Sequence, residues 1–207
     1  MHNKYSLIEL NEIELRTIGH YDNNAQSFWH GTRDHDVSQN IESFLQALPN
    51  KTLDILDFGC GPGRDLHAFK SLGHRPVGVE GSKELCQLAI KHSGCQVRQQ
   101  SFLQLELDDN SFDGIFANAS LFHIPSQELP KVLSKLHRVL RPEGVLFASN
   151  PRGNAEGWQG ERYGHYMEFE ASKVYLEQAG FKIVHHYYRP EGKSIEQQPW
   201  LAIVAQC

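Results

Sequence analysis

The sequence has few of the residues that build metal knuckles and disulfide scaffolds. It contains only four cysteines, at positions 60, 86, 95 and 207, and no two of them form a C-x-x-C pair. This spacing argues against a zinc knuckle and against a disulfide framework. We therefore expect reduced thiols, as in a cytoplasmic protein.

The sequence also lacks a strong excess of one charge and any long apolar run. The chain has 20 Lys and Arg against 25 Asp and Glu, a net charge of −5, and no basic stripe. Nucleic acid is therefore not an expected partner. No apolar run is long enough to cross a bilayer, and residues 1–10 lack the pattern of a signal peptide. Membrane association is likewise not expected.

Histidine is abundant but scattered. The twelve histidines include one adjacent pair, His185 and His186, which would point to opposite faces of a strand. No H-x-x-x-H spacing falls on a predicted helix, so the sequence predicts no metal site. Separate surface, core or substrate-facing roles explain these residues better.

The chain reads as a single domain with a helical extension. Residues 1–50 form the predicted extension, which is helical over 21–48 with a break near 31–32 and is expected to cover a ligand site. Residues 51–207 alternate strands with helices, the helices being predicted at 62–72, 82–92, 126–141 and 168–179, where Ser82 and Ser126 are the expected N-caps. The glycine-rich stretch 152–164 is predicted to be a loop.

The strand pattern predicts an α/β fold. Strands are expected at 53–58, 75–80, 95–100, 112–118, 144–150, 181–188 and 200–206. Strands alternating with helices form a parallel sheet covered on both faces. No helix separates the last two strands, so they should pair antiparallel. A seven-stranded, mostly parallel sheet with its last strand antiparallel is Rossmann-like and is similar to the class I methyltransferase fold.

A glycine-rich loop follows the first strand and opens a helix. It reads DFGCGPGRD over 57–65, with Gly59, Gly61 and Gly63 spaced G-x-G-x-G and Asp57 two residues before the first glycine. Glycine lets the backbone turn tightly and approach a ligand. Dinucleotide enzymes use G-x-G-x-x-G, and Arg64 occupies that third position here. The pattern therefore favours S-adenosylmethionine as cofactor, with Asp57 bonding its amino group directly or through water.

Polar residues at the next strand ends complete the expected cofactor site. Glu80 ends the second strand and can accept hydrogen bonds from both ribose hydroxyls, with Gly81 forming the turn behind it. Ser101 and Phe102 follow the third strand, where the adenine should lie, although Ser101 stands where many relatives carry Asp. Arg33 and Asn118 are the remaining predicted cofactor contacts.

Five segments carry a more specific resemblance, which covers about residues 21–206. They are FWHGTRDHDVSQN (28–40), DFGCGPGRDL (57–66), FANASLFHIPSQELP (116–130), SNPRG (149–153) and EQQPWLA (196–202). Together they resemble the C-terminal methyltransferase domain of the bifunctional ovothiol-biosynthesis enzyme, 5-histidylcysteine sulfoxide synthase. The iron-binding synthase domain of that family is absent from this sequence, and Ser101 replaces the family's common Asp.

The resemblance implies methyl transfer to the π nitrogen of 5-thiohistidine, which gives ovothiol A. A carboxylate on this acceptor would favour an arginine fork, for which Arg152 is preferred over Arg33, Arg162 and Arg189. Asn150, at the end of the fifth strand, is a further predicted substrate contact. Aromatic residues are predicted to wall the imidazole, namely Phe28, Trp29, Phe122, Trp158, Tyr163 and Tyr166.

The acceptor imidazole must lose a proton, so a histidine is the expected base. His123, after the fourth strand, and His165 are the candidates, and Tyr163 is placed beside them in the reactive part of the site. Ordinary packing explains His123 about equally well. Methylation of another small thiol or amine, or cofactor binding without catalysis, also fits the sequence. An NAD oxidoreductase fits poorly because of Arg64.

Overall fold

The computed structural model describes residues 4–207 and shows one seven-stranded sheet with helices on both faces. The strands are β1 (Asp54–Phe58), β2 (Arg75–Glu80), β3 (Gln96–Gln99), β4 (Phe112–Asn118), β5 (Leu140–Pro151), β8 (Lys182–Arg189) and β9 (Trp200–Gln206). Their order is β3-β2-β1-β4-β5-β9-β8, and β9 runs antiparallel to both β5 and β8. The predicted fold class and the antiparallel closing pair are therefore confirmed.

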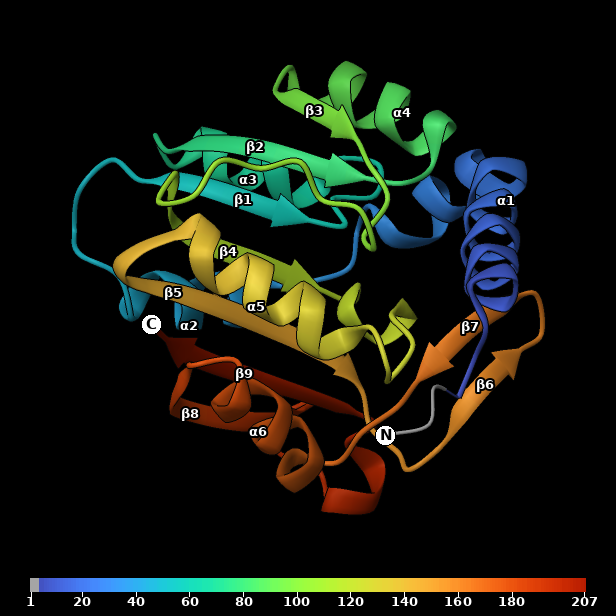
Figure 1. The fold of residues 1–207 in the computed structure, drawn as a ribbon. Coiled ribbons are helices and arrows are strands. Elements are labelled where there is room, and N and C mark those ends of the chain that lie inside the picture. The colour runs from blue at the N-terminus through green and yellow to red at the C-terminus, as the bar shows by residue number, and fades with distance from the viewer. Residues whose placement is uncertain (1–3) are drawn as a thin grey trace.

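The helices divide between the two faces of the sheet and its edges (Figure 1). They are α1 (Leu7–Thr32), α2 (Ser38–Gln46), α3 (Arg64–Ser71), α4 (Lys83–Ser93), α5 (Leu129–Val139) and α6 (Phe169–Gln178). Short 3-10 turns, η1 (Leu121–His123) and η2 (Ile195–Gln197), follow β4 and precede β9. Among residues 4–207, no helix combines the length and apolar character needed to cross a membrane.

Two hydrophobic cores lie on opposite faces of the sheet. One contains Leu133 and Leu136 of α5 and Leu176 of α6. The other is aromatic: Phe116 and Phe147, from adjacent strands, stack with ring centroids 4.7 Å apart, and Phe44 of α2 packs on both. Burying both faces explains why the central strands are continuous apolar runs.

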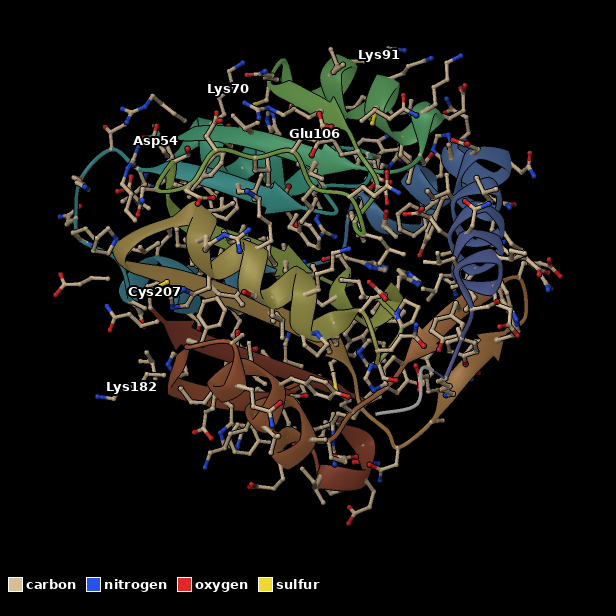
Figure 2. All side chains as sticks on the ribbon, in the orientation of Figure 1. Asp54, Lys70, Lys91, Glu106, Lys182 and Cys207 are labelled. Atoms are coloured by element: carbon tan, nitrogen blue, oxygen red, sulfur yellow. The ribbon has the colours of Figure 1, made fainter. Side chains whose placement is uncertain are left out.

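α1 stands at the end of the sheet toward which the β1, β2 and β4 arrowheads point (Figure 1). It begins at Leu7 instead of near residue 21, because Ser6 and Glu9 form a capping box, a signal that the sequence offered and the prediction missed. The opposite end of the sheet is polar. There Arg141 lies 2.9 Å from Asp54 and 3.0 Å from Asp113, and Figure 2 labels Asp54 far from α1.

Two local predictions were wrong. Residues 152–164 contain a hairpin, β6 (Glu156–Gln159) with β7 (Arg162–His165), in which Gly160 takes a φ of 64° at the turn. Its abundant glycines hid this short strand pair. Ser126 does not cap α5. The N-cap residue of α5 is Glu128, and a proline stands in the first turn of the helix. The Ser126 amide and hydroxyl instead donate hydrogen bonds to Glu156.

Gly114 tests how tightly the aromatic core is packed. A Cβ at this position would lie 2.5 Å from the Phe44 ring. We expect Gly114→Ala to lower the free energy of unfolding by about 1–3 kcal/mol, because the ring is enclosed and can shift little. Gly19→Ala, in α1 with no atom within 4 Å of the added carbon, should instead stabilise by up to about 1 kcal/mol. Denaturant unfolding measures both; equal effects would contradict the packing.

Candidate active site

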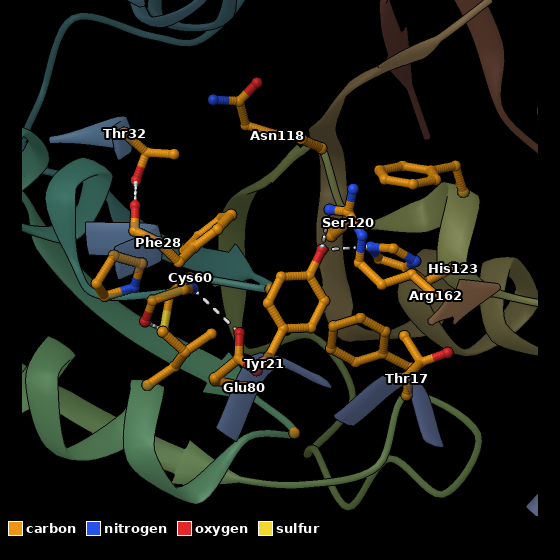
Figure 3. Close-up of a pocket in the computed structure, with 18 of the residues that line it drawn as sticks. Thr17, Tyr21, Phe28, Thr32, Cys60, Glu80, Asn118, Ser120, His123 and Arg162 are labelled. Carbon is orange, nitrogen blue, oxygen red and sulfur yellow. Dashed lines mark hydrogen bonds between the residues drawn. The ribbon is translucent and has the colours of Figure 1, made fainter. Parts of the chain in front are cut away.

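A cavity of about 600 Å³ opens where the carboxyl ends of β1, β2 and β4 meet α1. Ligands of open α/β sheets bind at this edge of the strands. The cavity is also bounded by η1, the β6–β7 hairpin and the β8–β9 end (Figure 3). Nine of the predicted site residues line it, together with the alternative anchors Arg162 and Arg189: Phe28, Gly59, Gly61, Glu80, Gly81, Phe102, Asn118, Phe122 and His123.

The glycine loop needs glycine for two separate reasons. Gly59, Gly61 and Gly63 all have positive φ, at 77°, 50° and 90°. A Cβ on Gly59 would also lie 2.4 Å from the Ser120 Cβ, so the loop and the turn after β4 can approach only without a side chain. Gly63 begins α3 and packs on Ala89 of α4. It lies outside the cavity, so the structure gives it a packing role.

Glu80 lies buried in the floor of the cavity and holds the loop in place. Its Oε2 accepts from the Gly61 amide at 3.1 Å and its Oε1 accepts from the Ser82 amide at 2.8 Å. Burial raises the pKa of this carboxyl, while the backbone hydrogen bonds act in the opposite direction. Each oxygen keeps a lone pair, so the carboxylate can still accept from ligand hydroxyls.

Asp57 lies behind the loop, outside the cavity lining. Burial is the main cause that raises the pKa of its carboxyl well above the ordinary value, and the nearby Asp65 adds to this. Within the described residues its Oδ2 atom has no hydrogen-bond partner. A buried polar atom without a partner is costly. The atom fits the predicted bond, direct or through water, to a cofactor amino group.

Tyr21, His123 and Arg162 form a chain of hydrogen bonds on the cavity wall (Figure 3). His123 Nδ1 lies 2.7 Å from the Tyr163 carbonyl and Nε2 lies 2.8 Å from the Tyr21 hydroxyl. A carbonyl only accepts, so Nδ1 carries the hydrogen and Nε2 accepts from Tyr21. The Tyr21 oxygen in turn accepts from Arg162 at 3.2 Å. The tautomer of His123 follows from its partners.

These hydrogen bonds change the expected role of His123. Burial lowers the pKa of its imidazole to about 4, so the ring is neutral near pH 7. Its basic nitrogen faces the hydroxyl of Tyr21, which thus stands between His123 and a ligand on that side. Sequence reasoning missed Tyr21, which belongs to no motif. Its only signal is helical spacing, since Thr17, Tyr21 and Phe28 fall on one face of α1.

Several residues predicted for the reaction site lie outside the cavity lining, and their ligand contacts stay predictions. Tyr163 is buried, and its hydroxyl donates to Glu156 at 2.6 Å. Trp158 packs edge-on against it from the outer side of the hairpin and carries Arg16 over its ring. His165 is buried beside Tyr175, with an Nδ1 that has no partner in the described chain.

Trp29, Asn150, Arg33 and Ser101 also lie outside the cavity lining and have other partners in the chain. Trp29 stacks on His92, with centroids 4.1 Å apart. Asn150 accepts from the Phe122 amide and so supports η1 from behind. Arg33 is exposed and pairs with its neighbour Asp34. Apart from the pair between the neighbours Arg33 and Asp34, these contacts depend on tertiary packing, which the motifs do not encode. Ser101 bonds the cavity residue Glu14.

The arginines divide into paired and unpaired groups. Arg152, the preferred acceptor anchor, is paired with Glu168 at 3.0 Å and donates to the Ile195 and Gln198 carbonyls. Its Nε and Nη1 are thus engaged outside the cavity lining, and its role as acceptor anchor stays a prediction. Arg162 and Arg189 line the cavity, and in residues 4–207 neither has a carboxylate within 4.0 Å. These two guanidinium groups can receive an anionic ligand.

The comparisons with known proteins agree with this geometry. Residues 56–148 match a family model described as a methyltransferase domain. The chain is 34% identical over 113 residues to 24-methylenesterol C-methyltransferase 2 of Arabidopsis thaliana, covering 51% of this chain and 30% of that protein. It is 28% identical over 125 residues to malonyl-[acyl-carrier protein] O-methyltransferase of Pectobacterium atrosepticum, covering 57% and 49%. The chain thus spans half or less of these relatives.

Solved structures share the fold across nearly the whole chain. The 1,6-didemethyltoxoflavin-N1-methyltransferase of Burkholderia thailandensis, solved with S-adenosylhomocysteine, has a TM-score of 0.76 at 20% identity, covering 100% of this chain and 92% of that one. A methyltransferase of Archaeoglobus fulgidus gives 0.70 at 16% identity, covering 88% and 97%. The fold and the matched domain together support a class I methyltransferase that uses S-adenosylmethionine.

Removing the Glu80 carboxylate tests the cofactor site. We expect Glu80→Ala to weaken S-adenosylmethionine binding about tenfold or more, because hydrogen bonds to a charged group contribute about 1.5–3 kcal/mol. Calorimetry measures the affinity, and circular dichroism checks the fold. Glu84→Ala, on the exposed side of α4, is the control. An unchanged affinity would place the ribose elsewhere.

Acid should destabilise the protein partly through His123. Its folded pKa of about 4 lies below its ordinary value of 6.5, so the unfolded state binds the proton more readily between these pH values. Its contribution is present above pH 6.5 and is lost as the pH falls toward 4. From pH 7 to 5 we expect a loss of about 1–2 kcal/mol. In denaturant unfolding, the free energy of unfolding of the wild type should fall by this amount more than that of His123→Gln. If the free energies of the two proteins fall in parallel with pH, the prediction is contradicted.

Proposed function

We propose that the protein transfers a methyl group from S-adenosylmethionine to a small acceptor that carries a carboxylate. The main observation behind this proposal is that two arginines of the cavity, Arg162 and Arg189, have no carboxylate partner in the described chain. By contrast, Arg64, which also lines the cavity, is neutralised by Asp65 at 2.7 Å. A cation that faces a partly apolar cavity without a counterion favours an anionic ligand.

Two of the five segments that carry the resemblance meet beside this cavity. The Arg152 amide donates to the Pro199 carbonyl at 2.8 Å, which joins SNPRG to EQQPWLA. The next residue, Trp200, is the cross-strand partner of Arg189, and both line the cavity. Arg152 therefore supports the wall that presents Arg189 and Trp200. This explains how a residue outside the cavity can belong to a substrate-specific motif.

We infer that the acceptor is 5-thiohistidine and that its π nitrogen is methylated to give ovothiol A. The resemblance of the five segments supports this acceptor. The cavity chemistry agrees, because 5-thiohistidine carries a carboxylate and an acidic thiol, which suit two cationic residues. Phe28, edge-on to Tyr21, and Phe122, beside His123, provide aromatic wall for an imidazole ring.

When bound, S-adenosylmethionine supplies a methyl group on a positively charged sulfur. The residues of the chain align the acceptor and exclude water, and alignment can contribute roughly 7–11 kcal/mol. If the acceptor gives up a proton on the Tyr21 side, that proton moves to the Tyr21 oxygen while the Tyr21 hydrogen moves to His123 Nε2. His123, as an imidazolium, then donates from both nitrogens, to Tyr21 and to the Tyr163 carbonyl.

Lysine substitutions distinguish the arginines. Arg162→Lys and Arg189→Lys keep the charge but lose the planar fork, so at least one should raise the acceptor KM several-fold or more while cofactor affinity stays near wild type. Arg138→Lys, on the exposed side of α5, is the control. Steady-state kinetics measures KM. A rise in KM confined to Arg152→Lys would return the anchor to that residue.

The site of methylation tests the acceptor itself. The thiolate of 5-thiohistidine is the stronger nucleophile, so an N-methyl product requires that the protein hold the π nitrogen in line, at roughly 3–3.5 Å. The π nitrogen lies on the side of the amino-acid arm, so anchoring the carboxylate also orients it. We expect labelled methyl on this nitrogen by two-dimensional NMR, and slower, less selective reaction of the decarboxylated analogue.

The assay also separates the two levels of the proposal. Methyl on sulfur, or no product from 5-thiohistidine while another small acceptor turns over, would reject the ovothiol assignment and leave the methyltransferase class. Binding of S-adenosylmethionine without turnover of any small acceptor would favour a cofactor-binding module. Mass spectrometry of the product with labelled S-adenosylmethionine distinguishes these results.

A further inference from the structure

A carboxylate of α1 enters the cavity beside the segment that follows β3. Glu14 lines the cavity, and its Oε1 accepts a hydrogen bond from the Ser101 hydroxyl, 87 residues away in the sequence. Neither residue belongs to the glycine loop or to the Tyr21 chain. The pairing places a negative charge at a position where Ser101 itself supplies none.

The hydrogen bonds of Ser101 leave Glu14 as the acceptor at this point. The Ser101 Oγ accepts from the Leu103 amide at 3.0 Å, and its hydrogen goes to Glu14 because a carboxylate only accepts. Ser101 therefore has no hydrogen to offer a ligand. In the described chain the second oxygen of Glu14 has no hydrogen-bond partner, so the carboxylate can still receive a donor.

The walls around this carboxylate are apolar. Ile13 and Ile18 line the cavity from α1, and Phe102 and Leu103 line it from the segment after β3. A Cβ on Gly81 would lie 3.0 Å from the Ile18 Cδ1, so this part of α1 packs directly on the turn after Glu80. The apolar part of the cavity therefore adjoins the carboxylate that is expected to hold the ribose.

An apolar compartment with a carboxylate fits one class of group. The group must have apolar faces, be joined to a ribose and carry a hydrogen-bond donor on its edge. The adenine of a nucleoside meets each condition, because its faces stack on apolar side chains and its 6-amino group donates. A base with a 6-oxo group presents an acceptor there, which a carboxylate repels.

We propose that Glu14 accepts the 6-amino group of the cofactor adenine and selects adenine over 6-oxopurines. Ser101 is the positioning residue that holds the Glu14 carboxylate. The inference rests on the cofactor part of the proposed function and is independent of the acceptor. α1 thus supplies a specificity-determining residue to the cofactor site as well as covering it.

The test is calorimetry with S-adenosylhomocysteine and S-inosylhomocysteine, in which a 6-oxo group replaces the 6-amino group. We expect wild type to prefer the adenosyl ligand by about tenfold or more, and Glu14→Gln to bind it about tenfold more weakly. The glutamine amide can donate, so this variant should bind the inosyl ligand better than wild type does. Glu12→Gln, on the exposed side of α1, is the matched control and should leave both affinities unchanged.

A rescue separates a role in binding from a role in structure. Ser101→Asp in the Glu14→Gln background returns a carboxylate to this part of the cavity, so adenosyl affinity and the preference for adenine should recover. Equal loss for both ligands in Glu14→Gln, or an unchanged adenosyl affinity while Glu80→Ala still weakens binding, would overturn the inference alone. Failure of wild type to bind S-adenosylhomocysteine would overturn the cofactor proposal with it.

Discussion

The carboxylate of Glu80 is the contact on which the rest of the site depends. It bonds the amide of Gly61 in one βα turn and the amide of Ser82 in the next, so a single buried side chain fixes both loops relative to each other. The close approach of Gly59 to Ser120 then sets the third wall, after β4. Because these contacts join three parallel strands at the same edge, the cavity floor is part of the sheet and should be rigid.

α1 closes the cavity opposite this floor. Its residues face the floor from across the cavity, where Glu14 approaches Ser101 and Tyr21 bonds to His123. The direction of each hydrogen bond follows from a partner that can only accept, a carboxylate in one case and a backbone carbonyl in the other. The helix thereby places a charged acceptor toward the expected adenine and a neutral, oriented phenol toward the expected acceptor. In the proposed function one element would serve both ligands, which would link cofactor binding to the arrangement of the reaction site.

The arginines near the cavity differ in whether they have a carboxylate partner. Arg152 is consumed by Glu168 and two carbonyls, and it stabilises the segment that carries Trp200. Arg162 and Arg189 line the cavity; Arg162 donates to the Tyr21 hydroxyl and Arg189 to the Asp36 carbonyl, but in the described chain neither has a carboxylate within 4.0 Å. An arginine inside one of the resembling segments thus supports the cavity wall from behind, while two arginines outside those segments line the cavity. A sequence motif can therefore include residues that support the site by packing and never contact a ligand.

The sequence by itself determined the sheet and the cofactor loop, because both depend on local signals. Apolar runs, the spacing of Gly59 and Gly61 and the acid at Glu80 all act over a few residues, and strand alternation with helices leaves few topologies. Only the tertiary structure decided which side chains reach the cavity. Tyr21 and Glu14 belong to no motif, the glycines around Trp158 hid a hairpin, and Arg152 looked free until its partners 16 and 46 residues away were in place. A residue's periodicity tells which face of an element it occupies, but what covers that face depends on elements distant in the chain.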